Sequence, residues 1–470
     1  MEKEKFDIGM VGLGVMGRNF VLNIADHDYA VVGLDNDEDK ASALEKEAGQ
    51  QKVQGTTSPE AFISGLKKPR AVMMLVPAGK AVDSVIDELI PLLDEGDLII
   101  DGGNSHFTDT NRHYTKLKEK NIHFMGVGIS GGEKGARFGP SIMPGGSEKA
   151  YDRVQSIFEA AAAEVKGDPC VTWLGPGSAG HYVKMVHNGI EYGLMQLIAE
   201  CYDIMKRGLG FDNDKLHQVF KKWNEAELSS FLMEITADIF AQPDDKSNGR
   251  LIDAILDSAK QKGTGKWASQ DAMDLQVPIP TIDMAVAMRD ISAYKEERAH
   301  ASEVLQGPEN HLDVDPDIFV GRLRNAMYFS MIAAYAQGMA LLRAASDEYE
   351  YELNYQDIAK IWRGGCIIRA DLLEEIRAAY VSNPTLTNLL IAPSLSDELK
   401  KCQADLRFVI GKASNAGIPA PALMASLGYY DSYRSKRLPA NLIQAQRDNF
   451  GSHTYERTDI EGTFHTEWND

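Results

Sequence analysis

Hydrophobic and polar positions follow two different patterns along this chain, and the change falls near residue 178. Before it, short apolar runs alternate with amphipathic stretches. The apolar runs predict strands over 6–11, 30–34, 71–76, 98–101 and 123–127, and the stretches between them predict helices near 16–27, 37–48, 80–93 and 109–119. Strands that are apolar throughout are typical of a parallel sheet with both faces buried. We therefore predict a doubly wound, Rossmann-like α/β domain over residues 1–177, to which the apolar runs 140–144 and 170–174 could add strands.

After the turn Gly175-Pro176-Gly177, apolar positions repeat at helical spacing over long windows, as in 182–207 and 322–345. This pattern predicts a large all-helical domain over residues 178–435. The last stretch, 436–470, is polar and aromatic. It predicts a C-terminal tail that does not fold on itself and must dock on another surface.

Composition narrows the range of functions. The chain has 470 residues and a formal net charge of −20, which disfavours nucleic acid and anionic membranes as partners. No apolar run approaches the roughly 18 residues of a transmembrane helix, and the charged N-terminus is unlike a signal peptide. The four cysteines lie far apart without metal-ligand spacing, which indicates reduced thiols in a cytoplasmic protein and no metal site. An anionic substrate would need a local basic pocket.

The segment Gly12-Leu13-Gly14-Val15-Met16-Gly17 follows a predicted strand and opens a predicted helix. In that setting Gly12 permits a tight turn, Gly14 lets a pyrophosphate approach the backbone, and Gly17 lets the helix pack on the strand. Amides at the helix N-terminus can then hold the diphosphate. The segment predicts a dinucleotide site.

The segment Asp35-Asn36-Asp37 ends the second predicted strand. A carboxylate at this point accepts hydrogen bonds from the ribose hydroxyls of NAD but repels the 2′-phosphate of NADP. No arginine lies within 35–39 to bind that phosphate. Asp37 also suits the N-cap of the following helix, which leaves Asp35 unexplained. The residues predict NAD rather than NADP.

A polar stripe lies within the first long helix of the second domain. Lys184, His187, Asn188 and Glu191 are spaced by three, four and seven residues, so they share one helical face. A solvated face is the alternative, but the helix also contains Gly189 and Gly193, which cost stability of about 1 kcal/mol each. We interpret the stripe as functional: a lysine beside apolar groups can become a neutral base, and a glutamate there can stay protonated as an acid.

Two glycine-rich segments are less specific. Ser130-Gly131-Gly132 and Pro144-Gly145-Gly146 lie beyond a predicted strand, where amides and a hydroxyl suit a carboxylate or phosphate, although structural turns explain them equally well. The segment Gln261-Lys262-Gly263-Thr264-Gly265-Lys266-Trp267 is similar to a phosphate loop. It lacks the full Walker spacing and a preceding strand, which disfavours ATP.

These segments and others occur in the order of one family. The chain resembles the decarboxylating 6-phosphogluconate dehydrogenases of the pentose phosphate pathway, in the β-hydroxyacid dehydrogenase superfamily, over essentially its whole length. The further segments that carry the resemblance are Asp101-Gly102-Gly103-Asn104-Ser105, Gly135-Ala136-Arg137-Phe138-Gly139-Pro140-Ser141 and Gln446-Arg447-Asp448-Asn449-Phe450-Gly451-Ser452-His453. Shorter β-hydroxyacid dehydrogenases share the glycine turn and a lysine like Lys184, but they lack the long helical domain and the tail.

The resemblance implies oxidative decarboxylation of 6-phospho-D-gluconate to D-ribulose 5-phosphate and CO2, with hydride transfer from C3 to a nicotinamide cofactor. Lys184 would take the C3 hydroxyl proton and then stabilise the enolate, and Glu191 would protonate C1. The residues that would orient the sugar acid are Asn104, Ser130, Gly131, Gly132, His187 and Asn188. Those that would hold its phosphate are Tyr192, Lys262, Arg289, Arg447 and His453. Besides the glycine turn, the residues that would contact the cofactor are Asp35, Asn36, Asp37, Val76, Pro77, Ala78 and Asn104.

The resemblance also implies a homodimer in which Arg447 and His453 reach the partner subunit's site. No metal is implied, because Lys184 can polarise the carbonyl.

Two departures from the family pattern concern the cofactor. Most members carry Asn-Arg-Ser/Thr where this chain has Asp35-Asn36-Asp37, and a lysine where it has Pro77. Both changes remove positive charge from the region of the 2′-phosphate, so we expect an NAD-preferring member, with the same reaction on NADP as the alternative. Leu194 also departs, since an acidic residue is common after Gly193.

Two other functions stay open. One is an NAD-dependent β-hydroxyacid dehydrogenase that acts on a non-phosphorylated acid. The other is an inactive dinucleotide-binding regulator, which the presence of both Lys184 and Glu191 disfavours.

Overall fold

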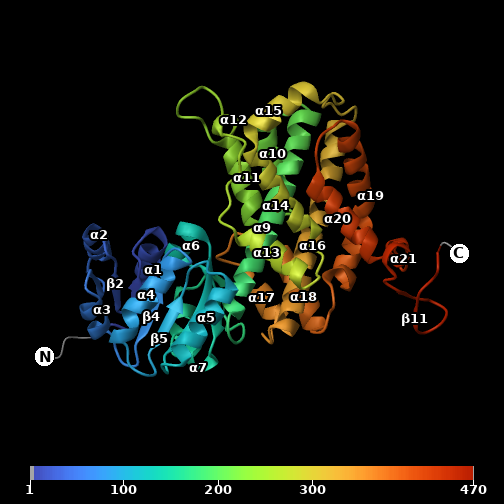
Figure 1. Ribbon diagram of the computed structural model, residues 1–470. Helices are drawn as coiled ribbons and strands as arrows, with labels where there is room; N and C mark the ends of the chain where they lie inside the picture. The colour runs from blue at the N-terminus through green and yellow to red at the C-terminus, as the bar shows by residue number, and fades with distance from the viewer. Residues whose placement is uncertain (1–4, 469–470) are drawn as a thin grey trace.

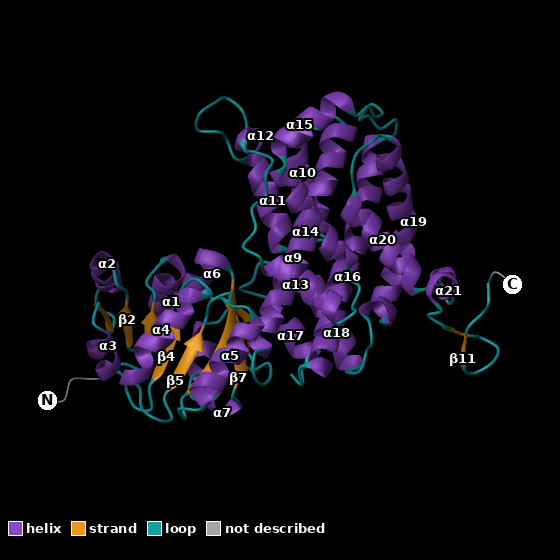
Figure 2. Ribbon diagram, viewed as in Figure 1, coloured by secondary structure: helices purple, strands orange, loops and turns teal. Residues whose placement is uncertain are grey.

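The computed structural model describes residues 5–468, and two parts of different construction lie side by side in it (Figure 1). The first part combines strands and helices. The second is helical, and within the described residues up to 468 its only strands form a short hairpin near the C-terminus (Figure 2).

The first part is built on a seven-stranded sheet in the order β3-β2-β1-β4-β5-β6-β7. Its strands are β1 (Ile8–Val11), β2 (Val31–Leu34), β3 (Val53–Thr56), β4 (Ala71–Met74), β5 (Leu98–Asp101), β6 (His123–Ser130) and β7 (Ser141–Gly146). Its helices are α1 (Val15–Asp26), α2 (Glu38–Ala48), α3 (Pro59–Gly65), α4 (Lys80–Leu89), α5 (Phe107–Lys118), α6 (Gly132–Phe138), α7 (Glu148–Tyr151) and α8 (Gln155–Ala161). All neighbouring strands pair in parallel except β6 and β7, which are antiparallel. The predicted Rossmann-like doubly wound domain is confirmed.

The sequence predicted the buried strands but not β3, the strand at the edge of the sheet. β1, β2, β4 and β5 are buried at every position, as their apolar runs indicated. The sequence of β3, Val-Gln-Gly-Thr, has no apolar run that would indicate a strand, because this strand is partly exposed at the sheet edge. The run 140–144 corresponds to β7. The run 170–174 is not a strand: Val171 makes one isolated bridge to Ile142, after the small hairpin of β8 (Glu164–Val165) and β9 (Asp168–Pro169).

The second part is a bundle around α9 (Ala179–Asp203) and α16 (Pro316–Glu348), and the predicted helical domain is confirmed. Both helices are buried over most of their length, because apolar residues occupy nearly every face. The other helices are α10 (Asn213–Asn224), α11 (Phe231–Ala241), α12 (Leu251–Ala254), α13 (Thr264–Asp274), α14 (Pro280–Ala293), α15 (Lys295–Val304), α17 (Tyr355–Trp362), α18 (Leu372–Ser382), α19 (Pro393–Asn415) and α20 (Pro421–Tyr433). No helix among residues 5–468 is long and apolar enough to cross a membrane.

The C-terminal tail has more structure than we predicted. It forms α21 (Ala440–Gly451) and a hairpin of β10 (Tyr455–Glu456) and β11 (Thr463–Phe464). The buried Asp448 carboxylate accepts hydrogen bonds from the Thr454 amide, the Thr466 amide and the Trp468 indole. The expectation that the tail does not fold on itself is wrong, because the Asp448 carboxylate accepts hydrogen bonds from the segment after α21 and so holds that segment against the helix.

Candidate active site

The glycine turn has the geometry that a bound diphosphate needs. Gly12 has φ +91°, and a Cβ there would lie 2.7 Å from the Leu75 carbonyl oxygen. A Cβ on Gly17 would overlap the Gly12 carbonyl, so the start of α1 packs directly on the turn. A Cβ on Gly14 would meet nothing within 4 Å. The backbone is therefore open at Gly14, where the pyrophosphate would approach.

Asp35 is fixed beside this turn. Its Oδ2 accepts the Leu13 amide at 2.8 Å, its Oδ1 accepts the Asp37 amide at 3.1 Å, and Lys40 Nζ lies 3.3 Å from Oδ1. Burial raises the pKa of Asp35, but these hydrogen bonds outweigh it and the pKa is lowered overall. Asp35 is therefore an anion at the turn. Asp37 caps α2 as predicted, since it accepts the Asp39 amide at 3.0 Å.

The helix with the polar stripe is seated on the sheet by glycines. A Cβ on Gly128 in β6 would overlap the Lys184 Cβ and lie 3.0 Å from its Cγ. Gly145 in β7 and Gly180 in α9 also bring the two backbones together. A Cβ on Gly145 would lie 2.2 Å from the Gly180 nitrogen, and a Cβ on Gly180 would lie 2.6 Å from the Gly145 nitrogen. Only glycine allows this approach, which carries Lys184 to the end of the sheet.

Lys184, His187 and Asn188 of the α9 stripe are buried and the Glu191 side chain is 20% exposed, so a solvated face is excluded. Lys184 is 6% exposed, and its Nζ lies 3.4 Å from His187 Nδ1. His187 Nδ1 is 3.0 Å from Asn188 Oδ1 and 3.8 Å from Glu191 Oε2, and its Nε2 is 3.2 Å from the Ser130 hydroxyl. The structure thus brings these five predicted residues into one cluster.

Burial sets the protonation of this cluster. It lowers the pKa of the Lys184 ammonium, although the charge of Glu191 opposes the shift. It raises the pKa of Glu191, against the charges of Lys184 and Arg289. It lowers the pKa of His187 well below its usual value, and the Lys184 charge adds to the effect. Burial therefore works against the charged form of each of these three groups, while the attraction between Lys184 and Glu191 favours the charged forms of that pair.

The loop after α17 completes the site, and we did not predict it. A Cβ on Gly131, which has φ +113°, would lie 2.5 Å from the Gly365 carbonyl oxygen, and that oxygen accepts the Ser141 amide at 2.8 Å. The loop therefore packs against the Ser130 turn and buries Cys366 near Lys184. Its only signal in the sequence is the glycine pair Gly364-Gly365 between two helices.

Arg289 lies near the C-terminal end of the polar stripe, beside Tyr192. The Arg289 guanidinium lies 3.4 Å above the centre of the Tyr192 ring, and its Nη1 is 3.5 Å from the Lys260 carbonyl oxygen. The neighbouring residue Gln261 donates to Asp290 at 2.7 Å. The segment 260–261 therefore lies along α14 beside Arg289, and Lys262, the next residue, is exposed.

A narrow pocket joins the two parts of the molecule beside Lys184. The residues that line it are Asn104, Ser105, His181, Lys184, Met185, Asn188, Thr264 and Trp267. Asn104 comes from the loop after β5 and Thr264 from the start of α13. The pocket therefore unites the predicted cofactor side, the Lys184 stripe and the phosphate-loop-like segment.

Comparison with known proteins identifies this arrangement. The family model for the NAD binding domain of 6-phosphogluconate dehydrogenase matches residues 7–175, and that for its C-terminal domain matches residues 180–468. The chain belongs to the 6-phosphogluconate dehydrogenase family. It is 51% identical over 465 residues, 99% of both chains, to the NADP(+)-dependent, decarboxylating 6-phosphogluconate dehydrogenase of Bacillus subtilis. It is also 51% identical to the decarboxylating enzyme of Synechococcus elongatus over 464 residues, 98% of both chains.

A solved structure agrees. The 6-phosphogluconate dehydrogenase of Plasmodium falciparum, described in apo form and in complex with its cofactor NADP+ and with its substrate 6-phosphogluconate, has a TM-score of 0.94 and 46% identity. The match covers 98% of this chain and 100% of that one.

These relatives do not support the NAD preference that we expected from Asp35. The Bacillus relative is NADP-dependent and the Plasmodium relative binds NADP+, so the alternative cofactor fits the comparisons better. Our expectation rested on local charge at Asp35 to Asp37 and on Pro77, and neither of these two relatives supports it.

Arg447 and His453 are not brought to the Lys184 cluster of the same chain. Arg447 donates to Gln444 at 3.0 Å, and the His453 ring contacts the Phe450 ring at 5.8 Å between centroids. In Figure 1, α21 stands on the side of the helical part that faces away from the sheet.

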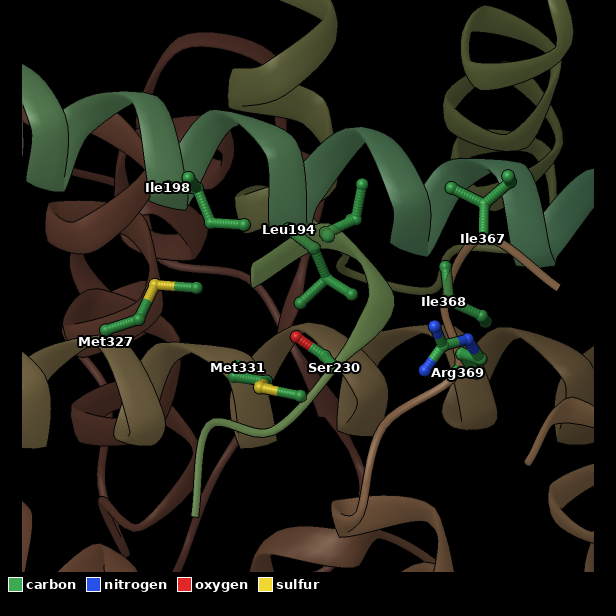
Figure 3. A pocket seen from close by; sticks show the side chains of 9 residues that line it. Leu194, Ile198, Ser230, Met327, Met331, Ile367, Ile368 and Arg369 are labelled. Carbon is green, nitrogen blue, oxygen red and sulfur yellow. The ribbon is translucent and has the colours of Figure 1, made fainter. Parts of the chain in front are cut away.

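Leu194, where the family commonly has an acidic residue, lines a separate apolar pocket between α9 and α16 (Figure 3). Met327, Met331 and Ile367 line the same pocket. A carboxylate would be desolvated in these surroundings, which explains why a leucine suits this chain. The free space is about 10 Å3, room for at most one water.

Proposed function

We propose that this protein converts 6-phospho-D-gluconate to D-ribulose 5-phosphate and CO2 while it reduces a nicotinamide dinucleotide. The observation that carries the proposal is the pair Lys184, which is buried, and Glu191, which is mostly buried, on one helix face with opposite pKa shifts. An acid–base reaction at two carbons of one substrate needs such a pair.

Lys184 acts first, as the base. Its neutral amine takes the proton of the substrate's C3 hydroxyl as that carbon is oxidised. The dinucleotide, held by the glycine turn, Asp35 to Asp37, Val76 to Ala78 and Asn104, supplies the hydride acceptor. The product of this step is a β-keto acid.

Loss of CO2 follows from that β-keto acid, because the electrons of the breaking bond delocalise into the C3 ketone. Lys184 is then an ammonium and stabilises the developing enolate oxygen. Glu191, whose pKa is raised by burial, delivers a proton to C1 of the enediol. Lys184 and Glu191 thus exchange protonation states during one turnover.

The remaining polar residues bind the substrate. We propose that Asn104, Ser130, Gly131, Gly132, His187 and Asn188 orient the sugar acid. We propose that Tyr192, Lys262 and Arg289 hold the 6-phosphate, which the contact between Tyr192 and Arg289 supports. A substrate screen with and without that phosphate tests this assignment, and equal turnover of a non-phosphorylated β-hydroxyacid would contradict it.

We propose NADP as the acceptor that the relatives favour. NAD is the second candidate, and the observation in its favour is the Asp35 carboxylate, which is held as an anion at the turn. Lys40 is the cation nearest to that carboxylate in the contacts described, so NADP binding would require it to turn toward the 2′-phosphate.

Measured kcat/KM with each cofactor decides between them. A higher value with NADP supports the first candidate, and a higher value with NAD assigns the second. Asp35→Asn should raise the NADP-to-NAD ratio by about tenfold in either case, since it removes a like charge near the phosphate. Asp39→Asn, a change of an exposed residue in the first turn of α2, is the control and should leave the ratio unchanged.

We further propose a cytoplasmic homodimer with the domains divided at 177/178 and 435/436. All four cysteines are free and buried, which supports a reducing compartment. The position of α21 supports a role for residues 436–470 at the site of the partner subunit, to which Arg447 and His453 would contribute.

A further inference from the structure

The loop after β5 presents Asn104 to the pocket, and the residue before the loop is unusual. Asp101 ends β5 and is 0% exposed, although a buried carboxylate is costly unless its oxygens accept hydrogen bonds. Asn104 itself is exposed. The buried acid therefore lies three residues before an exposed amide that the site uses.

The Asp101 carboxylate holds the residues on both sides of Asn104. Its Oδ1 accepts the Gly103 amide at 2.9 Å, and its Oδ2 accepts the Ser105 hydroxyl at 2.6 Å. Both oxygens are thus used within the loop. The Asn104 backbone is fixed from either side by one carboxylate.

The Asp101 backbone holds the loop against the Lys184 helix. His181 in α9 lies one turn before Lys184, and its Nε2 is 3.1 Å from the Asp101 carbonyl oxygen. His181 Nδ1 is 2.6 Å from the Thr110 hydroxyl of α5. Gly126 in β6 leaves room for the ring, since a Cβ there would lie 2.8 Å from His181 Nδ1.

The other side of the loop contacts the end of β4 and the residues that follow it, among them Val76, which we predicted to contact the cofactor. The Gly102 amide donates to the Met74 carbonyl at 2.9 Å, and a Cβ on Gly103 would lie 3.2 Å from the Val76 carbonyl oxygen. The loop is therefore positioned between the residues that follow β4 and the start of α9.

We propose that Asp101 is a positioning residue of the reaction: it sets Asn104 relative to Lys184, through the Gly103 and Ser105 contacts on one side and His181 on the other. The inference rests on the proposed function, in which Asn104 contacts the sugar acid. A displacement of about 1 Å in such a group costs roughly 10²-fold in rate.

A double-mutant cycle tests the proposal. Asp101→Asn keeps the size of the side chain but cannot accept from both partners as a carboxylate does. If Asp101 acts through Asn104, Asp101→Asn and Asn104→Ala each lower kcat/KM by roughly 10²-fold, and the double variant is no worse than either. Additive losses would overturn the proposal.

Asp97→Asn is the matched control. Asp97 is 1% exposed at the opposite end of β5, where it accepts the Arg70 amide at 2.6 Å and pairs with the Arg70 guanidinium. Its loss should lower the free energy of unfolding and combine additively with Asn104→Ala in kcat/KM. Coupling as strong as that of Asp101 would show a general effect of β5 instead of positioning.

Hydrogen exchange separates this inference from the proposed function. In the unliganded protein, Asp101→Asn should speed exchange of the Gly103 amide, and Asn104→Ala should not. Unchanged exchange would overturn the positioning role. Wild-type protein without turnover of 6-phosphogluconate would overturn the proposed function, while faster exchange in Asp101→Asn would still support the held loop.

Discussion

At the scale of residues, the chemistry depends on where two ordinary side chains are buried. A surface lysine would be an ammonium at neutral pH and a surface glutamate a carboxylate, so the first could not act as a base and the second could not act as an acid. Burial in α9 lowers the pKa of Lys184 and raises that of Glu191. Each residue opposes the shift of the other through its charge, so the two pKa values are linked.

This linkage has a measurable sign. Lys184 must be neutral to act as a base, so the rate of substrate oxidation rises as pH increases through its pKa. The Glu191 charge raises that pKa, so Glu191→Gln should move the acid limb of the pH–rate profile to lower pH. The profile of cofactor reduction in a single turnover checks the shift. A limb that stays in place or moves to higher pH would contradict the proposed coupling.

Replacement of the base itself should be more severe. Lys184→Met fills the same space without an amine, so kcat should fall by about 10²- to 10⁴-fold while the Kd of the cofactor is unchanged. Steady-state kinetics and calorimetric titration of the cofactor measure both. Lys206→Met, a change of a partly exposed lysine just beyond α9, is the control and should retain turnover.

At the scale of elements, glycines decide how α9 meets the sheet. The sequence pattern predicted the helix and its polar stripe, but it left Gly189 unexplained. In the structure a Cβ on Gly189 would lie 3.1 Å from the Ala268 side chain, so the missing side chain at Gly189 lets α13 pack closely on α9. The cost to helix propensity is offset by close packing of the helices that bring Thr264 and Lys184 to one pocket.

Gly128→Ala should therefore disturb the site as well as the fold. The added methyl would overlap the Lys184 side chain, and overpacking of this kind costs about 1–3 kcal/mol of unfolding free energy. We expect a parallel loss of kcat as α9 is displaced. Gly411→Ala in α19 is the control, since a Cβ there meets nothing within 4 Å and should be neutral or stabilising. Denaturant unfolding and steady-state kinetics of both variants provide the comparison. An unaffected kcat in Gly128→Ala would contradict the expected displacement of α9.

Sequence reasoning reached elements whose pattern is local and missed contacts that are not. Apolar runs sufficed for β1 or β5, because burial on both faces leaves a signal at every position. β3 and the Gly364-Gly365 loop lack such a signal, since their places depend on partners far along the chain. The Lys184 stripe was predictable from helical spacing, whereas the tail's fold around Asp448 depends on donors that have no periodicity.

At the scale of the whole molecule, the net charge of −20 contrasts with the cations Lys262 and Arg289 that we propose hold the substrate's phosphate. An anionic sugar acid would be repelled overall and bound locally, which favours recognition by a few fixed cations. Two of the predicted cations, Arg447 and His453, lie on the preformed tail and away from the Lys184 cluster of the same chain. The proposed homodimer accounts for this separation, because the tail of one subunit can complete the site of the other.

Mixed dimers test this division of the site. Arg447→Ala should lower kcat/KM by about 10- to 100-fold through loss of a charged hydrogen bond, and Lys184→Met should be nearly inactive. If Lys184 and Arg447 of one site come from different subunits, a reassociated equal mixture contains heterodimers with one intact site. About a quarter of wild-type activity should then return, since half of the dimers each carry one intact site of two. A mixture of Lys184→Met with Glu191→Gln is the control: both residues lie in α9, so every site of its heterodimers carries one substitution and no activity should return. Failure of the first mixture to recover, under conditions in which subunits exchange, would place Arg447 outside the partner's site.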